Sequence, residues 1–438
     1  MTRSIQKNVR FYTTFFPPEG AHDFTYIWVP DSRDAGYYIE YYRRYGGRPF
    51  EIEDRLRRHL PDEPTDVSTF HVSPAPSSGK GRARRPVILY AQSDTLADSA
   101  ARIYSALSDE VPLRLFYPAY KDEGAEAFFA ARGLPAEKFS IKRLWKAKPR
   151  LLVLFNDWAK EAQRVISICR LMRIPTVCIQ ESIIDFGDRF RRMQHADHVC
   201  MQGIQSVLDL PREAYYITGN PRYQIRQPSD ESERRQRPLK ALVNCNFTYG
   251  IYEEVRDVWL ADVTSALTEH HIDFRISQHP RDRGDLRRYG DRVISSGAAT
   301  IAQQIAESDL IITRFSSLIH EGILQGKKVI YYNPHGENMK YEFRFNDTFL
   351  FLCTTSEALK KAIARIKQAL SPYDHVPYCI EHCLPYHTSV MENLKRIFTQ
   401  AHLPPRPVTF KDFLRLFLYQ PWLLKTLRKG RRMLRQLI

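Results

Sequence analysis

Two carboxylates, Asp157 and Glu181, each come directly after a short apolar run of the sequence. These runs, residues 151–155 and 175–180, have the nearly continuous apolar pattern of buried parallel strands. Because open α/β sheets bind ligands at the carboxyl ends of their strands, we expect both carboxylates at one edge of a sheet. A carboxylate there can transfer a proton to or from a hydroxyl, or attack an anomeric carbon. Asp157 and Glu181 are therefore the candidate catalytic residues.

Two later stretches carry side chains that suit a phosphate group and a ribose. Residues 278–281 include His279 and Arg281, and residues 313–317 include an arginine and two serines. The serines can cap the helix that the apolar spacing of residues 318–324 predicts, so that its first N–H groups face an anion. Glu321 in that helix is placed to accept a hydrogen bond from a ribose hydroxyl. An ordinary structural βαβ unit with a serine cap is the alternative interpretation.

Alternating strands and helices must position these side chains. The first series of predicted elements has strands at 87–92, 113–117, 151–155, 175–180, 196–201 and 215–218, with helices at 96–107, 123–132 and 158–172. A charged segment at 228–238, bounded by proline, is predicted to be a hinge. The second series has strands at 240–245, 274–278, 310–313 and 329–332, with helices at 252–269, 302–307, 318–324, 356–370 and 390–401. The fold class is therefore α/β, with two Rossmann-like domains, 87–227 and 239–400, facing a cleft.

The segments before the first series have a different composition. Residues 1–70 are dense in aromatic side chains and are predicted to form an N-terminal module or elaboration. Residues 72–86 are rich in serine, proline, glycine and arginine, which predicts a linker. The basic glycine-rich part of this linker is not a P-loop, because no strand leads into it and no Gly-Lys-Ser/Thr sequence occurs there.

The formal net charge of +15 is concentrated in two places. Residues 413–438 hold seven Lys or Arg side chains and no acid, and the linker adds four more. The remainder of the chain is nearly neutral, whereas a nucleic-acid-binding protein more often spreads its basic residues over one folded face. The segment 404–438 is also amphipathic, so we predict that this tail associates with an anionic membrane surface. A solvated tail, or one packed on the body, is the alternative.

The composition also bears on location and metal binding. No apolar run reaches the roughly 18 residues of a membrane span, and the polar N-terminus lacks the apolar core of a secretory signal. Seven scattered cysteines favour a reducing compartment. We expect a cytoplasmic protein bound peripherally to the inner face of the cytoplasmic membrane. No metal is predicted, because the group Cys379, His382, Cys383 and His387 matches no standard zinc spacing.

Four sequence motifs carry a resemblance to a known family. They are G-N-P-R at 219–222, L-V-N-C-N-F at 242–247, S-Q-H-P-R at 277–281, and T-R-F-S-S followed by H-E-G and G-K-K-V-I-Y-Y at 313–332. Over about residues 86–338 the chain resembles bacterial surface-carbohydrate glycosyltransferases of the GT-B fold. That group includes the capsule-type 3-deoxy-manno-octulosonic acid (Kdo) transferases and, more distantly, the CDP-glycerol glycerophosphotransferases.

The resemblance implies a cytidine or uridine nucleotide donor bound by the C-terminal domain. It implies phosphate contacts from His279, Arg281, Ser316 and Ser317, and a ribose contact from Glu321. The full set of expected donor-binding residues is Asn246, His279, Arg281, Arg314, Ser316, Ser317 and Glu321. The glycerophosphotransferases carry a His-Gly motif in the N-terminal domain, where this chain has Gln-Glu-Ser at 180–182. That departure favours a sugar transferase that uses carboxylates.

The predicted function is transfer of a Kdo-like sugar from a CMP-linked donor to a surface-polysaccharide or lipid-linked acceptor. The donor is a substrate, and no other cofactor or nucleic-acid partner is expected. Three alternatives remain open: a CDP-glycerol-type glycerophosphotransferase, a UDP-sugar 2-epimerase of the same fold, and a non-catalytic binding module in polysaccharide assembly. The stereochemistry of the transfer stays open, because it depends on the separation of the two carboxylates.

Overall fold

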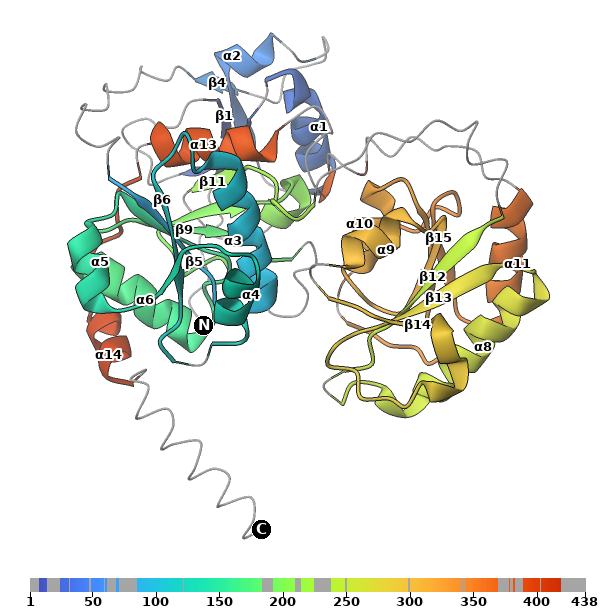
Figure 1. Ribbon diagram of the computed structural model, residues 1–438. Coiled ribbons are helices and arrows are strands. Elements are labelled where there is room, and N and C mark those ends of the chain that lie inside the picture. Colours follow the sequence, from blue (N-terminus) through green and yellow to red (C-terminus); the bar gives the residue numbers. More distant parts are fainter. Residues whose placement is uncertain are drawn as a thin grey trace, which may run out of the picture. The chain divides into compact units, whose positions relative to one another are not determined.

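The protein divides into two α/β units, each built on a parallel sheet (Figure 1). The computed structural model describes residues 8–13, 24–30, 32–46, 49–58, 60, 68–70, 85–120, 122–182, 192–208, 214–223, 238–248, 250–297, 300–339, 341, 343–368, 378, 381–382, 389–401 and 403–418. The first unit is formed by the described residues within 1–181, 188–222 and 380–438, and the second by those within 182–187 and 223–379.

An eleven-stranded parallel sheet forms the centre of the first unit, in the order β4-β3-β1-β2-β11-β10-β9-β8-β5-β6-β7. Its strands are β1 (Asn8–Tyr12), β2 (Phe24–Trp28), β3 (Phe50–Glu53), β4 (Ser68–Phe70), β5 (Val87–Tyr90), β6 (Leu113–Tyr117), β7 (Ala136–Lys138), β8 (Leu151–Leu154), β9 (Thr176–Ile179), β10 (His198–Met201) and β11 (Ala214–Ile217). Strands β5, β8 and β9 are buried along their whole length, as expected where helices cover both faces of a parallel sheet.

The helices of the first unit follow their strands through short loops. They are α1 (Ala35–Tyr45), α2 (Asp54–Arg57), α3 (Asp94–Leu107), α4 (Ala125–Ala131), α5 (Ile141–Ala147), α6 (Lys160–Leu171), α13 (Val390–Thr399) and α14 (Phe410–Leu418), with short 3-10 turns η2 (Ser32–Asp34) and η3 (Ile204–Val207). Side-chain caps fix where several of them begin. Ser93 accepts a hydrogen bond from the Leu96 amide at the start of α3, and Ser140 accepts one from the Arg143 amide at the start of α5.

A six-stranded parallel sheet forms the second unit, in the order β14-β13-β12-β15-β16-β17. Its strands are β12 (Lys240–Cys245), β13 (Asp273–Gln278), β14 (Val293–Ser295), β15 (Leu310–Thr313), β16 (Lys328–Tyr332) and β17 (Leu350–Cys353). Its helices are η4 (Glu253–Val255), α8 (Arg256–Glu269), η5 (Arg287–Arg292), α9 (Ile301–Ala306), α10 (Leu318–Leu324) and α11 (Ser356–Gln368).

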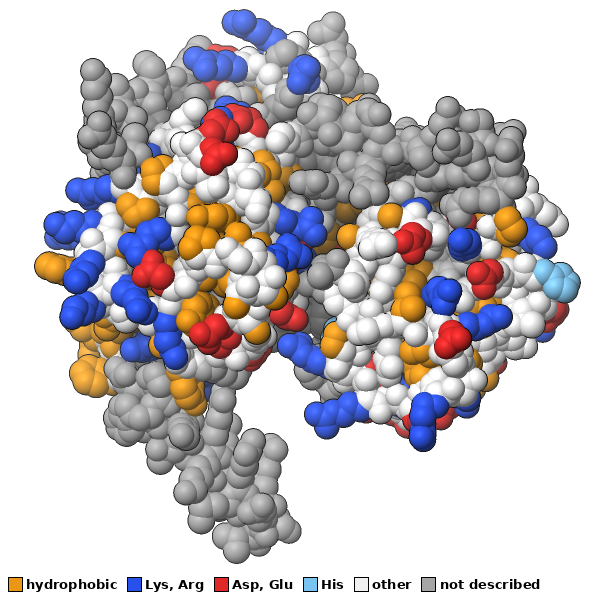
Figure 2. Space-filling model, viewed as in Figure 1, with side chains coloured by type: hydrophobic (Ala, Val, Ile, Leu, Met, Phe, Trp, Pro, Cys, Tyr) orange, Lys and Arg blue, Asp and Glu red, His pale blue; other side chains and the backbone are white. Residues whose placement is uncertain are grey.

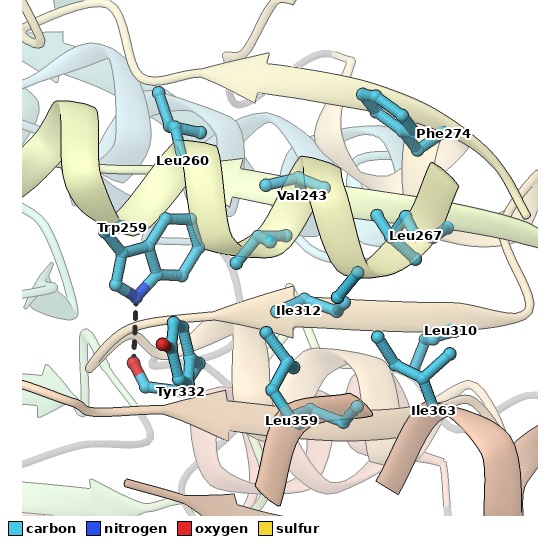
Figure 3. Close-up of a cluster of buried hydrophobic side chains, with 14 of the residues drawn as sticks. Val243, Trp259, Leu260, Leu267, Phe274, Leu310, Ile312, Tyr332, Leu359 and Ile363 are labelled. Carbon is cyan, nitrogen blue, oxygen red and sulfur yellow. Dashed lines mark hydrogen bonds between the residues drawn. The ribbon is translucent and has the colours of Figure 1, made fainter. Parts of the chain in front are cut away.

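The core of the second unit lies between the sheet and the helices α8 and α11 (Figure 3). Val243 and Ile312 of the sheet face Leu260 and Leu359 of the helices, and all four side chains are fully buried. Burying each such side chain contributes about 1.5–3 kcal/mol to the hydrophobic stabilisation. The indole N–H of Trp259 donates to the carbonyl of Tyr332 at 2.9 Å, so this core also satisfies its polar group.

The strand order reverses in both sheets. The first sheet has two reversals, one at β1, which has β2 on one side and β3 on the other, and one at β5, whereas the second sheet has one. In the first sheet, β5 leads outward to β6 and β7, whereas β8 lies on the other side of β5. In the second, β12 leads to β13 and β14, whereas β15 lies on the other side of β12. At such a reversal the loops leave in opposite directions, and the carboxyl ends of the two strands form the usual ligand site of an open α/β sheet.

The structure confirms the α/β class and the two parallel sheets, and it corrects two predicted boundaries. The four strands described between residues 8 and 70 form an elaboration of the first unit rather than a separate module, because β2 pairs with β11 and extends the first sheet. Helix α13 does not belong to the second unit. Its Asn393 and Arg396 side chains donate to the carbonyls of Thr218 and Pro30 of the first unit. The predicted linker and hinge lie almost wholly outside the described residues.

Candidate functional site

The loops at the carboxyl ends of β12, β13 and β15 bring the predicted donor-binding residues to one edge of the second sheet. His279 follows β13 and Ser316 follows β15, and both strands pair with β12. Two strand spacings correspond to roughly 10 Å. The His279 amide also donates to the carbonyl of Cys245, the last residue of β12, at 2.9 Å. The strand-order reversal between β12 and β15 lies within this group of loops.

His279 is half-buried, and the contact of one ring nitrogen indicates its tautomer. Its Nδ1 accepts a hydrogen bond from the Arg281 amide at 3.1 Å, so in the neutral ring the proton lies on Nε2. The side chain of Arg281 is exposed. The buried carboxylate of Asp282 accepts from the Phe247 amide at 2.9 Å and lies 3.0 Å from Arg256, which fixes the loop after β13 against the loop after β12.

Ser316, Ser317 and Glu321 lie at the start of α10. The Ser316 hydroxyl accepts from the Leu318 amide at 3.2 Å, and the Ser317 hydroxyl donates to Glu321 Oε1 at 3.1 Å. The N-cap residue Ser317 thus makes no side-chain cap and instead orients the Glu321 carboxylate, while Ser316, one residue earlier, accepts from the first amide of the helix. All three side chains are half-buried, so they remain partly accessible to a ligand.

Asn246 joins the two strands of the reversal. Its Nδ2 donates to the carbonyl of Phe315 at 3.1 Å, which connects the loop after β12 to the loop after β15. Its Oδ1 is buried and has no hydrogen-bond partner among the described residues. A buried acceptor without a partner is costly, so this oxygen is available to accept from a ligand.

Arg314 does not have the role expected of it. Its buried guanidinium pairs with Glu337, with Nη2 2.6 Å from Oε2, and Nη1 donates to the carbonyl of Ile251 at 3.0 Å. It also lies over the rings of Phe247 and Tyr252. Because these contacts occupy its donors, Arg314 holds three loops together and is not a phosphate ligand in this structure.

His335, which sequence reasoning did not single out, lies beside this ion pair. Its ring centroid is 4.7 Å from that of Tyr252, and its Nε2 is 3.7 Å from Glu337 Oε2. Burial lowers the pKa of His335, although Glu337 acts in the opposite direction. The signal that could have identified it is the sequence Asn-Pro-His-Gly-Glu at 333–337, directly after a predicted strand.

In the first unit, Asp157 is a structural residue. Its side chain is fully buried, Oδ1 accepts from the Met193 amide at 2.7 Å, and Oδ2 accepts from the amides of His195 and Ala196 at 2.6 and 3.1 Å. A carboxylate whose two oxygens are occupied by backbone amides fixes a loop and is closed to a substrate. Asp157 is therefore removed from the candidate catalytic residues.

Glu181 is half-buried at the end of β9, and a motif from the resemblance positions it. The Asn220 side-chain amide donates to the carbonyls of Gln180 and Glu181, at 2.5 and 3.4 Å. The Gln180 side chain is held in turn by the Gln202 amide and by Ser206, each at 3.0 Å. The loops after β9, β10 and β11 thus fix the backbone that carries Glu181.

A second carboxylate, Glu161, was missed. It lies in the first turn of α6, its side chain is 11% exposed, and its Oε2 has no hydrogen-bond partner within the described part of the chain. Burial raises the pKa of Glu161, and Arg164, 3.7 Å away, only partly opposes this. The hydroxyl of Tyr90, at the end of β5, is buried as well. Its pKa is raised by burial and further by Glu161.

Glu161 and Tyr90 belong to the two sides of the reversal between β5 and β8. A carboxylate with a raised pKa at a ligand-binding edge is suited to proton transfer. In the sequence, Glu161 and Arg164 look like an exposed helical pair, and only the structure shows that they are buried. Within the described ranges no group of three His, Cys, Asp or Glu side chains could hold a metal ion, and no helix is long and apolar enough to cross a membrane.

The fold is similar to that of solved nucleotide-sugar enzymes. The S. aureus MnaA–UDP co-structure matches with a TM-score of 0.50 and 12% identity, over 76% of this chain and 97% of that one. The UDP-GlcNAc 2-epimerase from Methanocaldococcus jannaschii matches with a TM-score of 0.50 and 13% identity, over 72% and 99%. No protein-family model matches the chain, and no curated protein matches its sequence. Together with the two parallel sheets, these matches show a GT-B-type fold of two Rossmann-like domains.

Proposed function

We propose that this protein is a nucleotide-sugar-dependent glycosyltransferase. It moves a Kdo-like sugar from a CMP-linked donor to a surface-polysaccharide or lipid-linked acceptor. The observation that carries the proposal is the gathering of His279, Ser316 and Asn246 around the strand-order reversal of the second sheet. This is the position where open α/β sheets bind nucleotides, and the side chains there suit the phosphate groups of a nucleoside diphosphate or monophosphate.

The donor contacts divide by chemistry. The Nε2–H of His279, the guanidinium of Arg281 and the hydroxyls of Ser316 and Ser317 donate to phosphate oxygens. The carboxylate of Glu321 and the Oδ1 of Asn246 accept from the ribose and the base. The S. aureus neighbour was solved with UDP, which supports a nucleotide as the ligand class. Cytidine is proposed because of the resemblance to the Kdo transferases, which by itself implies a cytidine or a uridine nucleotide.

Two carboxylates of the first unit are proposed for the chemistry. Glu181 has its backbone held in place by Asn220, and Glu161 has a raised pKa caused by burial. A carboxyl group whose pKa is raised keeps its proton to a higher pH than a free glutamate, so it can protonate a leaving group or, once ionised, accept a proton from an acceptor hydroxyl. Glu161 replaces Asp157 in this role.

A 2-epimerase acting on a UDP-sugar is the second candidate, because one solved structure with this fold is such an enzyme. Product analysis with the donor alone separates the two activities, since an epimerase returns an isomerised donor without any acceptor. A glycerophosphotransferase would consume CDP-glycerol in the same assay. A non-catalytic assembly module would bind a donor and turn over none of those tested.

The test is donor binding and hydrolysis across CMP-, UDP-, GDP- and CDP-linked compounds. We expect CMP-linked sugars to bind most tightly. His279→Ala and Ser316→Ala should each weaken binding roughly tenfold, because each removes a hydrogen bond to a charged group. Asp285→Ala, in an exposed ion pair of the same unit, is the control and should bind as the wild type. If none of these compounds binds, the proposal is wrong.

We also propose that the tail, residues 404–438, brings the enzyme to the anionic inner face of the cytoplasmic membrane, where lipid-linked acceptors are found. The seven Lys and Arg side chains of residues 413–438, where no acid follows Asp412, support this location. The last twenty residues of the tail, 419–438, lie outside the described ones.

A further inference from the structure

Helix α14 turns its apolar side towards solvent. Phe410, Phe413, Leu414 and Phe417 are 79%, 48%, 43% and 72% exposed. Their spacing of i, i+3, i+4 and i+7 places them in one stripe along the helix. In a helix that packs on a globular body, such a stripe is normally the buried side, so the orientation of α14 requires a cause.

The cause is a buried carboxylate on the opposite side of the helix. Asp412 is fully buried against α6, where its Oδ1 accepts from the Ser167 hydroxyl at 2.8 Å and from Arg170 at 3.2 Å. Its Oδ2 accepts from the amide and hydroxyl of Thr409 at 2.9 and 2.8 Å. Arg170 is paired in turn with Asp197 at 2.8 Å. Because this network is satisfied only when Asp412 faces inward, it holds the phenylalanines outward.

Helix α5 of the same unit exposes a second group of apolar and basic side chains. Ile141 and Trp145 are 50% and 63% exposed, while Leu144 is the buried anchor of the helix. The exposed cations in and after this helix are Lys142, Arg143, Lys146 and Lys148, and the helix contains no acid. Tryptophan beside lysine is typical of side chains that lie at a membrane–water interface.

The two helices lie on one side of the first unit. Arg150, which follows α5, donates to the carbonyls of Thr399 and Ala401, and this contact ties the end of α5 to the segment that leads into α14. Figure 1 shows α5, α6 and α14 along the same side. Figure 2 shows hydrophobic side chains over α14 and Lys and Arg side chains over α5.

We propose that α14 and α5 form a folded docking face for an anionic lipid bilayer. The charge of the surroundings decides between a lipid surface and a protein partner. Lys411 is exposed within α14, four cations surround α5, and six further Lys or Arg residues follow Leu418 in the sequence, with no acid after Asp412. Aromatic side chains enter the interface while the cations contact lipid phosphates. Two helices fix the orientation of the first unit on the membrane, which a tail alone does not do.

The inference extends the proposed membrane association and does not require glycosyl transfer. The experiment measures binding of the full-length protein to vesicles of phosphatidylcholine, alone and mixed with phosphatidylglycerol, at low and high salt. Two double variants are compared with the wild type: Phe413→Ser with Phe417→Ser, and Trp145→Ser with Lys146→Glu. The control is Val258→Ser with Lys361→Glu, which changes an exposed valine and an exposed lysine of the second unit. Thermal unfolding checks that every variant is folded.

We expect the wild type to bind anionic vesicles and to be released by salt. Each docking-face variant should lose roughly tenfold or more in affinity, while the control binds as the wild type. Nucleotide binding should not change in any variant, so failure here is distinct from failure of the proposed function. If both docking-face variants bound anionic vesicles with wild-type affinity, the inference would be overturned. Residues 419–438 alone would then account for the binding. A wild-type dimer that the double variant Phe413→Ser with Phe417→Ser dissociates would also overturn the inference, because the face would then bind a second copy.

Discussion

Glu337 connects parts of the second unit that lie far apart in the sequence. Its Oε2 pairs with Arg314, and its Oε1 accepts from the Phe315 amide at 2.7 Å and the Tyr331 hydroxyl at 3.1 Å. Arg314 reaches on to the carbonyl of Ile251. One buried ion pair thus sets the loops after β12, β15 and β16, which frame the proposed donor site.

Removing one partner of this pair should destabilise the second unit strongly. In Glu337→Ala, Arg314 keeps its charge in a buried place without a counter-ion, which typically costs about 3–5 kcal/mol. Urea unfolding of the second unit measures this loss in its free energy of unfolding. The control is Asp285→Ala, whose pair with Arg287 is exposed, and it should leave the midpoint unchanged. A loss in Glu337→Ala as small as that of the control would show that the pair is not structural.

Glu161 should make stability depend on pH in a specific direction. Burial raises the pKa of Glu161 above its usual value of 4.5, so the folded protein holds this proton more tightly than the unfolded chain. Its ionisation therefore opposes folding. The cost is absent below about pH 4 and grows as the pH rises through the folded pKa.

Glu161→Gln should accordingly unfold at the wild-type temperature near pH 4 and at a higher temperature near pH 7. Scanning calorimetry across this range measures the difference. Glu357→Gln, an exposed glutamate in the first turn of α11, is the matched control and should show no such gain at neutral pH. A lower unfolding temperature for Glu161→Gln at pH 7 would mean that its charge stabilises the fold.

The sequence predicts which residues of the candidate site follow a strand, but it does not predict whether their side chains are buried. Asp157 and Glu181 both follow a strand, as the apolar runs indicate, yet one is closed by three backbone amides and the other is half-exposed. The amides that close Asp157 come from residues 193–196, and no local pattern reports a contact across 36 residues or more. Arg314 was mistaken for a ligand for the same reason, because its partner Glu337 follows the next strand.

At the scale of elements, the close approach of α10 to the sheet depends on a glycine. A Cβ at Gly322 would lie 2.5 Å from Ile311 Cδ1 and 3.1 Å from Val329 Cγ2, on the neighbouring strands β15 and β16. The helix carries Glu321 and begins directly after Ser316 and Ser317 in the sequence. Its position therefore affects the proposed donor site directly.

Gly322→Ala should displace α10 and cost about 1–3 kcal/mol of stability, the usual range for overpacking a filled core. It should also weaken nucleotide binding, which isothermal titration calorimetry measures. Gly326→Asn is the control, because nothing lies within 4 Å of a Cβ there and asparagine tolerates its positive φ. If Gly322→Ala bound the nucleotide with wild-type affinity, binding would not depend on the position of α10.

Most elements of the two sheets follow from the alternation of apolar runs, and those that were missed share a physical cause. Helix α5 has seven residues and only one buried side chain, so its periodicity is too weak to read. Strand β14 has three residues and no fully buried one. The sequence predicts the helix α13 but not the unit to which it belongs, because an amphipathic pattern indicates that one face is buried and not which surface covers it.

At the scale of the molecule, the two units have separate cores. Each core contains a buried tryptophan whose fluorescence can follow the unfolding of that unit. Trp259 is buried in the second unit, whereas Trp28 is buried in the first. The proposed donor site uses residues of the second unit, and the proposed lipid face uses residues of the first. The two proposals can therefore be tested on one protein without interfering with each other.

A nucleotide should stabilise the second unit selectively. A ligand at one hundred times its dissociation constant stabilises the form that binds it by about 2.7 kcal/mol, because only the folded state has the site. Thermal unfolding with saturating CMP should raise the transition reported by the fluorescence of Trp259, assigned with a Trp259→Phe variant, and leave the transition of Trp28 in place. Ser316→Ala should remove most of this shift. A shift confined to the first unit would place the nucleotide on the sheet of Glu161 and Glu181 and contradict the assignment of the donor site to the second unit.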